Sequence, residues 1–207
     1  MNILDIVEIV KKTLEYFFST ILDVLRLINP ASVDTVSKNI KTLPLWFLRL
    51  YLIVIAVPLF VGYYLHFAYF QQDPYSVVNS LKLSARNYVI AVFLPMAIAY
   101  LLYLFDMRLV KKKVTYADAL TMIAYACSPG ILSGIFRISV SQFIDTWVLH
   151  ILLLMYSIYL IYAVLAARFG YDTAIKPFLF LILFGLLIAI IIYQALGFFI
   201  PPGYTGF

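Results

Sequence analysis

Five long apolar segments dominate the chain, and only short polar stretches separate one from the next. The segments cover residues 43–70, 88–105, 117–138, 147–167 and 177–200. A helix rises about 1.5 Å per residue, so roughly 20 mostly apolar residues cross a hydrocarbon core about 30 Å thick. The pattern therefore predicts an all-α fold, a polytopic membrane bundle of five transmembrane helices.

The N-terminal residues follow a different pattern, in which polar side chains recur every three or four positions among Ile, Leu, Val and Phe. These polar residues are Asp5, Glu8, Lys11, Lys12, Glu15, Ser19, Asp23 and Arg26. On a helix over residues 2–29 they form one narrow stripe, and their charges oppose insertion across a bilayer. We expect an N-terminal amphipathic helix that lies in the membrane interface and ends at Asn29-Pro30, because proline disfavours the helical conformation of the residue before it.

This change of pattern divides the chain into two parts. Residues 1–42 are expected to form a cytoplasmic amphipathic helix and linker, and residues 43–207 a five-span membrane domain. Two interpretations of the helix stay open. It is either a floor that packs across the cytoplasmic mouth of the bundle, or a helix that senses membrane curvature or binds a partner.

Composition and charge support a membrane location and indicate an orientation. Of 207 residues, 65% are hydrophobic and 12% are charged, and the net charge is +5. The basic residues are scattered among apolar segments, so they form no nucleic-acid-binding face. Twelve fall on one predicted side: Lys11, Lys12, Arg26, Lys38, Lys41, Arg49, Arg108, Lys111, Lys112, Lys113, Arg168 and Lys176. The positive-inside rule then places the N-terminus in the cytoplasm and the C-terminus outside.

Residues with catalytic or metal-binding chemistry are few. Cys127 is the only cysteine, which excludes an intrachain disulfide. His66, His150 and Asp145 are a common metal-ligand set, but they come from different segments and lack the close spacing of a metal motif. The apolar segments contain no Gly-x-Ser-x-Gly or His-Glu-x-x-His motif. We therefore expect no enzymatic activity, no metal and no cofactor.

Prolines inside the segments suggest an alternative function. Pro58, Pro95 and Pro129 each remove a backbone donor and are expected to bend a helix. Broken helices occur in transporters, so a small transporter or channel with a path lined by kinked helices remains the alternative. No ionisable residue lies near the middle of a segment, which argues against a proton-coupled pump. Gly130 and Gly134 form a small-xxx-small pair that permits close helix contact.

One stretch carries a more specific signal than hydropathy does. It reads Thr115-Tyr-Ala-Asp-Ala-Leu-Thr-Met-Ile-Ala-Tyr125-Ala-Cys-Ser-Pro129-Gly, with a short polar lead, then Tyr-Ala, then Pro three residues later. It resembles the third-span signature of the Yip family, the Ypt/Rab-interacting membrane proteins. Leu27-Ile-Asn29-Pro30-Ala resembles the Asn-Pro ahead of the bundle in prokaryotic members, and Arg168-Phe-Gly-Tyr171-Asp-Thr-Ala174-Ile-Lys-Pro177 looks like the joint where their last helix begins.

The resemblance implies a five-span protein without catalysis, with a role in membrane organisation or traffic. The Asp-Leu-Tyr-Gly-Pro motif of eukaryotic trafficking members is absent. We therefore predict a non-enzymatic integral protein of a prokaryotic cell membrane that organises membrane or acts as a partner-binding scaffold. Its partners would be the lipid bilayer and proteins at the cytoplasmic face, not nucleic acid, and homo-oligomerisation stays open.

Two groups of residues are expected to carry this function. The motif residues are Asn29, Pro30, Tyr125, Pro129, Gly130 and Gly134. The residues expected to contact lipid or a partner are the basic joint after the second segment, Arg108, Lys111, Lys112 and Lys113.

Overall fold

The computed structural model describes residues 3–28, 40–70, 76–105, 114–137 and 146–197. Within these ranges the chain is helical apart from short connections, which confirms the all-α expectation for this part of the protein. The predicted helix end at Asn29 and Pro30 lies outside the described residues, as does the basic joint from Arg108 to Lys113.

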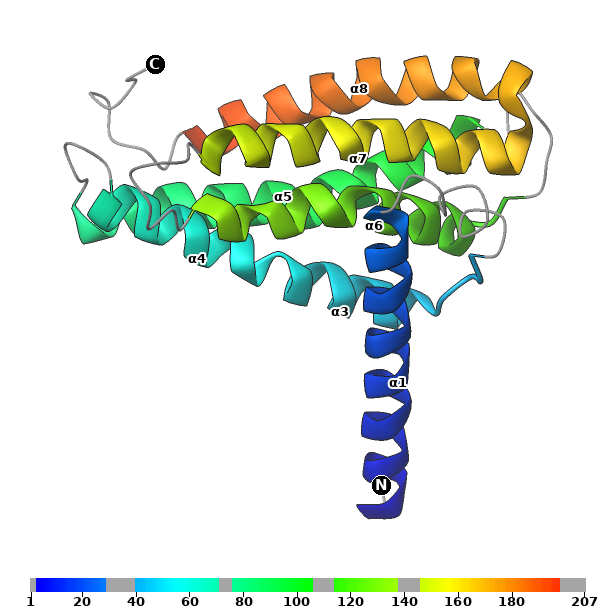
Figure 1. Cartoon of the computed structure of the whole chain (residues 1–207), viewed down its shortest axis with the longest axis horizontal. Helices are drawn as coiled ribbons and strands as arrows, with labels where there is room; N and C mark the ends of the chain where they lie inside the picture. The colour runs from blue at the N-terminus through cyan, green and yellow to red at the C-terminus, as the bar shows by residue number, and fades with distance from the viewer. Residues whose placement is uncertain (1–2, 29–39, 71–75, 106–113, 138–145, 198–207) are drawn as a thin grey trace.

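The bundle consists of α3 to α8, and a further helix among the described residues, α1, meets it at its C-terminal end. The helices are α1 (Ile3–Ile28), α3 (Leu45–Ile55), α4 (Val57–Leu65), α5 (Val77–Phe105), α6 (Tyr116–Leu132), α7 (Thr146–Phe169) and α8 (Tyr171–Gly197). A π-helical turn, His66–Phe70, extends α4, and a 3₁₀ turn, Ser133–Arg137, extends α6. In Figure 1 the bundle helices run along one long axis, whereas α1 runs across it.

Four helical segments among the described residues are long and apolar enough to span a membrane. They are Leu45–Tyr69, Val77–Phe105, Val148–Phe169 and Ala174–Ile192, and they correspond to the first, second, fourth and fifth expected spans. The expected third span contains α6, whose 17 residues rise roughly 25 Å before the 3₁₀ turn begins. This helix is not among the four segments, so the count of five spans stays a prediction.

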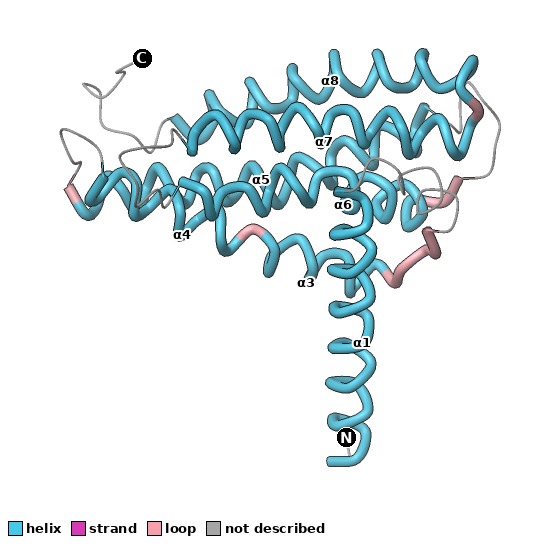
Figure 2. The backbone as a smooth tube through the Cα atoms, viewed as in Figure 1, coloured by secondary structure: helices cyan, strands magenta, loops and turns pink. Residues whose placement is uncertain are grey.

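The first two spans differ from the expected ones in two places. The first span is interrupted at Ala56, and Pro58 lies in the first turn of α4, where a missing backbone donor costs little. The loop colour in Figure 2 marks this break between α3 and α4. Helix α5 begins at Val77, so Lys82 and Arg86 lie in a helix and not in the expected joint.

The last two helices are joined by a single residue. Helix α7 ends at Phe169, and α8 begins at Tyr171, well before the start at residue 177 that the sequence suggested. Gly170 lies between them with φ of 90°, a conformation that L side chains rarely adopt. The stretch that resembles a family joint is therefore mostly helical.

Helix α6 lies at the centre of the bundle. Its residues from Ala119 to Ile131 are buried except for Cys127, which is partly exposed, and α3, α5 and α7 all contact it. Helix α8 lies at the periphery, and only 17% of its span is buried. Its inward side chains include Ala174 and Leu181, which are at most 1% exposed. The bundle therefore buries its small and hydroxyl-bearing residues on α6 together with aliphatic side chains, and leaves most of the aliphatic residues of α8 exposed.

Candidate functional site

The C-terminal half of α1 packs against the bundle through one face. Thr20, Val24 and Leu27 recur at helical spacing, and each is at most 1% exposed. Tyr16 and Phe17 are partly buried against the same core. Thr20 is the one fully buried polar residue of these five, and a buried hydroxyl needs a hydrogen-bond partner.

Aromatic contacts join α1 to α3. The ring centroids of Tyr16 and Phe47 are 5.4 Å apart, and those of Phe17 and Tyr51 are 5.9 Å apart in an edge-on arrangement. Phe47 and Tyr51 also stack on each other along α3, with centroids 6.1 Å apart. Aromatic pairs in these geometries each add about 0.5–1.5 kcal/mol beyond area burial, so the contact fixes α1 against the first span.

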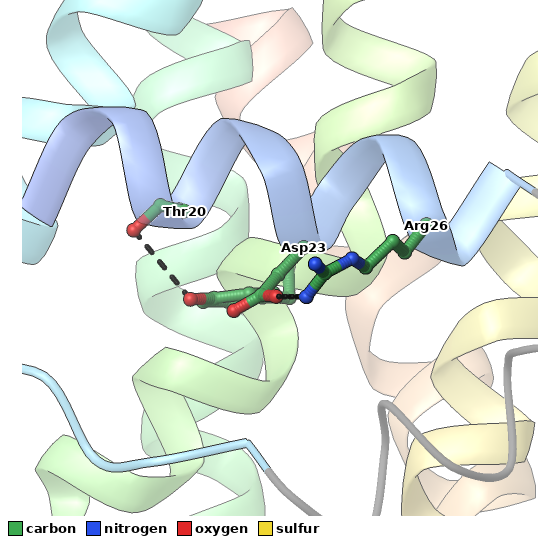
Figure 3. Close-up of polar contacts among 4 residues, drawn as sticks. Thr20, Asp23 and Arg26 are labelled. Carbon is green, nitrogen blue, oxygen red and sulfur yellow. Dashed lines mark hydrogen bonds and ion pairs between the residues drawn. The ribbon is translucent and has the colours of Figure 1, made fainter.

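Hydrogen bonds join α1 to α6 and α7. The Tyr125 hydroxyl of α6 donates to Thr20 Oγ1 at 3.5 Å, the dashed bond from Thr20 in Figure 3. On the same side of α1, Asp23 pairs with Arg26 at 3.3 Å. The Tyr156 hydroxyl of α7 donates to the backbone carbonyl of Leu27. Tyr125, the residue that the sequence singled out, is thus the contact that ties α1 to the central helix.

A polar cleft of about 740 Å³ lies between α1 and the bundle. Its polar lining comprises Tyr16, Ser19, Asp23, Lys41, Thr42 and Tyr125. The volume falls within the range of ~300–1,000 Å³ that is usual for ligand pockets. One carboxylate, one ammonium group and several hydroxyls suit this cleft to a polar lipid headgroup or a short peptide segment.

The lead into α6 forms the wall opposite α1. Thr115 caps the helix in a capping box: the Asp118 N–H donates to Thr115 Oγ1 at 3.2 Å, and the Thr115 N–H donates to the Asp118 carboxylate at 3.0 Å. The Thr42 hydroxyl also donates to Asp118, and the Leu43 N–H donates to Thr121 Oγ1 at 3.2 Å. Sequence reasoning treated this stretch only as a polar lead, although Thr-x-x-Asp before an apolar run is a recognisable cap signal.

The two motif glycines allow α6 to approach two different helices. The Gly130 N–H donates to Ser157 Oγ of α7 at 2.8 Å. A Cβ atom at Gly134 would lie 2.4 Å from the Leu59 Cα atom, within the backbone of α4. Pro129 lies in the buried part of α6 directly before Gly130. Gly130 therefore sits where α6 crosses α7, and Gly134, in the 3₁₀ turn that extends α6, sits against α4.

A buried hydrogen-bond cluster lies at the opposite end of the bundle. His150 is 3% exposed, and its ring hydrogen-bonds with the Ser133 hydroxyl and, at 3.5 Å, with the Tyr63 hydroxyl. Ser133 also donates to the Gly130 carbonyl at 2.6 Å. The described residues contain no group of three His, Cys, Asp or Glu side chains that could hold a metal ion. Hydrogen bonds to Ser133 and Tyr63 hold the His150 ring in place. Asp145, the third residue of the considered metal-ligand set, lies outside the described residues.

The remaining faces of α1 are exposed. Large apolar side chains recur along one of them, Val7, Val10, Leu14, Phe18 and Leu22, each 51–64% exposed. A second face carries charges that pair along the helix, as Lys12 and Glu8 do at 2.8 Å. The hydrogen bond and attraction to Lys12 lower the pKa of Glu8. The helix thus has three faces: one docked, one charged and one apolar without contacts to the bundle.

Comparison with protein families gives one match, the Yip1 domain, over residues 25–195. Searches of curated proteins and of solved structures gave no significant match. The matched region begins in the docked end of α1 and includes the bundle side of the cleft, the motif of α6 and nearly all of α8, but not the cleft residues Tyr16, Ser19 and Asp23 of α1. With four apolar segments able to span a bilayer and this match over most of its length, the chain belongs to the Yip1 domain family of integral membrane proteins.

Proposed function

We propose that the protein is a non-enzymatic membrane organiser in which α1 lies in the bilayer interface, anchored at one end to the spanning bundle. The observation that carries this proposal is the direction of α1. It runs across the bundle axis and leaves the apolar face from Val7 to Leu22 exposed. A helix parallel to the membrane plane, with one charged and one apolar face, inserts about 5–10 Å into the headgroup boundary.

The depth at which α1 meets the bundle agrees with an interfacial location. Its partner Tyr125 lies nine residues beyond Tyr116, roughly 14 Å along α6. If α6 begins at the water-facing edge of a headgroup region about 5–7 Å thick, α1 meets it just inside the hydrocarbon boundary. The N-terminal half of α1 extends away from the bundle, so it would occupy area in only one leaflet.

An anchored helix in one leaflet can change membrane shape or recruit a partner. Aromatic contacts to Phe47 and Tyr51 hold the helix at a fixed angle to the spans, so its insertion would act on the bilayer in a defined direction. The polar cleft and the basic joint from Arg108 to Lys113 would face the same side, available to lipid headgroups or a protein. In this proposal that side is the cytoplasm, the C-terminus is external, and the membrane is that of a prokaryotic cell.

The location of α1 can be measured with spin labels. Cys127 is the only cysteine, so a Cys127→Ala background allows single labels at Leu14→Cys on the apolar face and Lys12→Cys on the charged face. In reconstituted vesicles the Leu14 label should be accessible to dissolved oxygen and protected from a water-soluble nickel chelate, and the Lys12 label should show the reverse. Equal exposure of both labels to the chelate would place α1 in water and contradict the proposal.

The effect on membrane shape needs a separate test. Leu14→Asp adds a charge to the apolar face, and Ser19→Asp adds the same residue on the charged side of α1. If the helix shapes the bilayer, liposomes containing Leu14→Asp should lose the curvature seen with the unaltered chain by electron cryomicroscopy, and Ser19→Asp should retain it. Identical vesicle shapes for all three proteins would exclude a curvature role and leave partner binding through the cleft.

The conduit alternative has weaker support from the same geometry. Pro95 lines a cavity inside the bundle, but the side chains around it are mostly aliphatic. Such a lining binds hydrocarbon more readily than it passes a polar solute.

A further inference from the structure

A second cavity lies inside the bundle, away from α1. It measures about 450 Å³, and α5, α7 and α8 form its walls. Its floor is α6, through Cys127, Gly130 and Ile131. Leu154 and Ile158 of α7 and Leu186 of α8 line it while remaining 42%, 39% and 60% exposed. The cavity is therefore a groove that opens to the surface between α7 and α8.

The groove has a polar end and an apolar end. Tyr63, Asn87 and His150 line it at one end of the bundle. Ile98, Ile161 and Leu181 line it near the middle. From Asn87 to Ile98 along α5, and from His150 to Ile161 along α7, the groove runs roughly 16 Å. This length is close to half of a hydrocarbon core about 30 Å thick, so it corresponds to one leaflet.

The position of the groove decides what can enter it. Its walls are three of the segments that can span the membrane, so its mouth opens toward lipid and not toward water. Another helix, about 10 Å across with its side chains, is too wide to lie inside it. A flexible hydrocarbon chain fits both the shape and the lining.

We propose that this groove binds one acyl chain of a membrane lipid, with the lipid headgroup held at the Tyr63, Asn87 and His150 end and the chain directed toward Leu181. At the polar end the ring nitrogens of His150 already bond the Ser133 and Tyr63 hydroxyls, so hydrogen bonding to a headgroup would fall to the Asn87 amide. Asn87 donates to the Leu83 carbonyl at 3.0 Å, which uses one of the four hydrogen-bonding positions of its amide. Tyr63 and His150 contact each other edge-on, with ring centroids 6.2 Å apart. Gly130 and Gly185 also line the trough.

Photo-crosslinking in nanodiscs of phosphatidylcholine tests the site and its direction. Two phosphatidylcholine probes would carry a diazirine on the same acyl chain, one near the glycerol and one at the chain terminus. The first should label peptides that contain Asn87 or His150, and the second peptides that contain Ile98, Ile161 or Leu181. Identical labelling maps for the two probes, or labelling spread evenly over the exposed face of α8, would overturn the proposal.

A matched pair of variants on α8 tests occupancy. Ala189 lines the groove and Ala195 does not, although Ala195 is exposed on the same helix. Ala189→Phe should lower crosslinking inside the groove about tenfold, equivalent to roughly 1.4 kcal/mol in affinity, and Ala195→Phe should leave it unchanged. Helix content and thermal unfolding of both variants would show that they fold. Undiminished labelling in a folded Ala189→Phe protein would refute the site, and crosslinks between two chains would identify a second copy as the occupant.

Asn87→Leu tests whether the polar end of the groove recognises the lipid headgroup or whether an acyl chain merely occupies the groove. If the polar end binds the headgroup, this variant should reduce labelling by the glycerol-proximal probe more than labelling by the chain-terminal probe. An equal reduction for both probes would show that the amide supports the shape of the groove and does not bind the headgroup, and that part of the proposal would be withdrawn.

Discussion

Helices α6 and α8 differ in hydropathy, in length and in burial. The less apolar of the two, α6, lies at the centre of the bundle. Helix α6 carries one serine, one threonine and two tyrosines, is only 17 residues long and is buried from Ala119 to Ile131 apart from Cys127. Helix α8 contains the most hydrophobic span, with hydropathy 2.8, and only 17% of that span is buried. In a soluble protein the order of burial would be the reverse.

The difference follows from the solvent. A leucine side chain is as stable among lipid tails as it is against another helix. Aliphatic side chains on α8 therefore gain little free energy from burial inside the bundle. Small residues and hydroxyls on α6 gain close contact and hydrogen bonds, such as Tyr51 with Ser128 at 2.8 Å. In this bundle, small and polar residues distinguish the central helix α6 from the peripheral helix α8, although aliphatic residues still make up much of the core.

The largest effect should come from a methyl group at Gly134. Its Cβ would overlap the Leu59 backbone, which cannot move without shifting α4, so Gly134→Ala should destabilise the protein by about 3 kcal/mol. Gly185→Ala on α8 is the matched control, because its Cβ would lie 3.4 Å from Ile98, an ordinary contact. Unfolding by sodium dodecyl sulfate, followed by circular dichroism in mild detergent, measures both. Equal stability of the two variants would contradict the close α6–α4 crossing.

A smaller effect is expected at Gly130. Its Cβ would lie 2.9 Å from Ser157 Oγ, a side chain that can rotate away at the expense of its bond to the Gly130 N–H. Gly130→Ala should therefore cost about 1–2 kcal/mol. Ser157→Ala in the same chain removes the overlapping atom, and the double variant should be more stable than the sum of the single changes implies. Additive losses would show that the two residues do not interact.

The hydrogen bond between α3 and α6 should contribute less. Tyr51→Phe removes the bond to Ser128, while Ser128 keeps its bond to the Ala124 carbonyl at 2.6 Å. The expected loss is about 0.6 kcal/mol, the average for such bonds between membrane helices. A double-mutant cycle with Ser128→Ala isolates the pair. A coupling energy near zero would show that this hydrogen bond does not stabilise the bundle.

The smallest effect should be found on the lipid-facing side of α8. Leu187 is 50% exposed, so Leu187→Ala should change stability by less than about 0.5 kcal/mol in the same unfolding assay. A loss comparable to that of Gly134→Ala would indicate that this face is covered by another chain, and crosslinking at Leu187→Cys would then identify the contact.

The sequence predicted the helices better than it predicted their contacts. Hydrophobic length located four spans, and the spacing of polar residues located α1, because both signals are local. Hydropathy did not show where α6 ends, since its last residues remain apolar while the backbone tightens into a 3₁₀ turn at Ser133. The capping box at Thr115 and Asp118 is also local and could have been found from the same stretch.

The candidate site depends on contacts that no local pattern reveals. Thr20 and Tyr125 are 105 residues apart in sequence, and the cleft between them involves Lys41 from a third segment. The resemblance drew attention to Tyr125 but gave no sign of its contact with Thr20, and a functional role for Tyr125 stays a prediction. Asn29, Pro30 and the basic joint from Arg108 to Lys113 stay predictions, because they lie outside the described residues.

The one-residue joint at Gly170 has a consequence for how the protein is made. The entropy cost of bringing two helices together grows with the length of the connecting loop, and here the loop is as short as a reversal of direction allows. We expect α7 and α8 to form a hairpin as soon as both have left the ribosome, ahead of the long-range contacts that place α6 between its neighbours. Assembly would then proceed by docking a preformed pair, so a defect in that pairing would reduce the yield of protein in the membrane before it changed any property of the finished molecule.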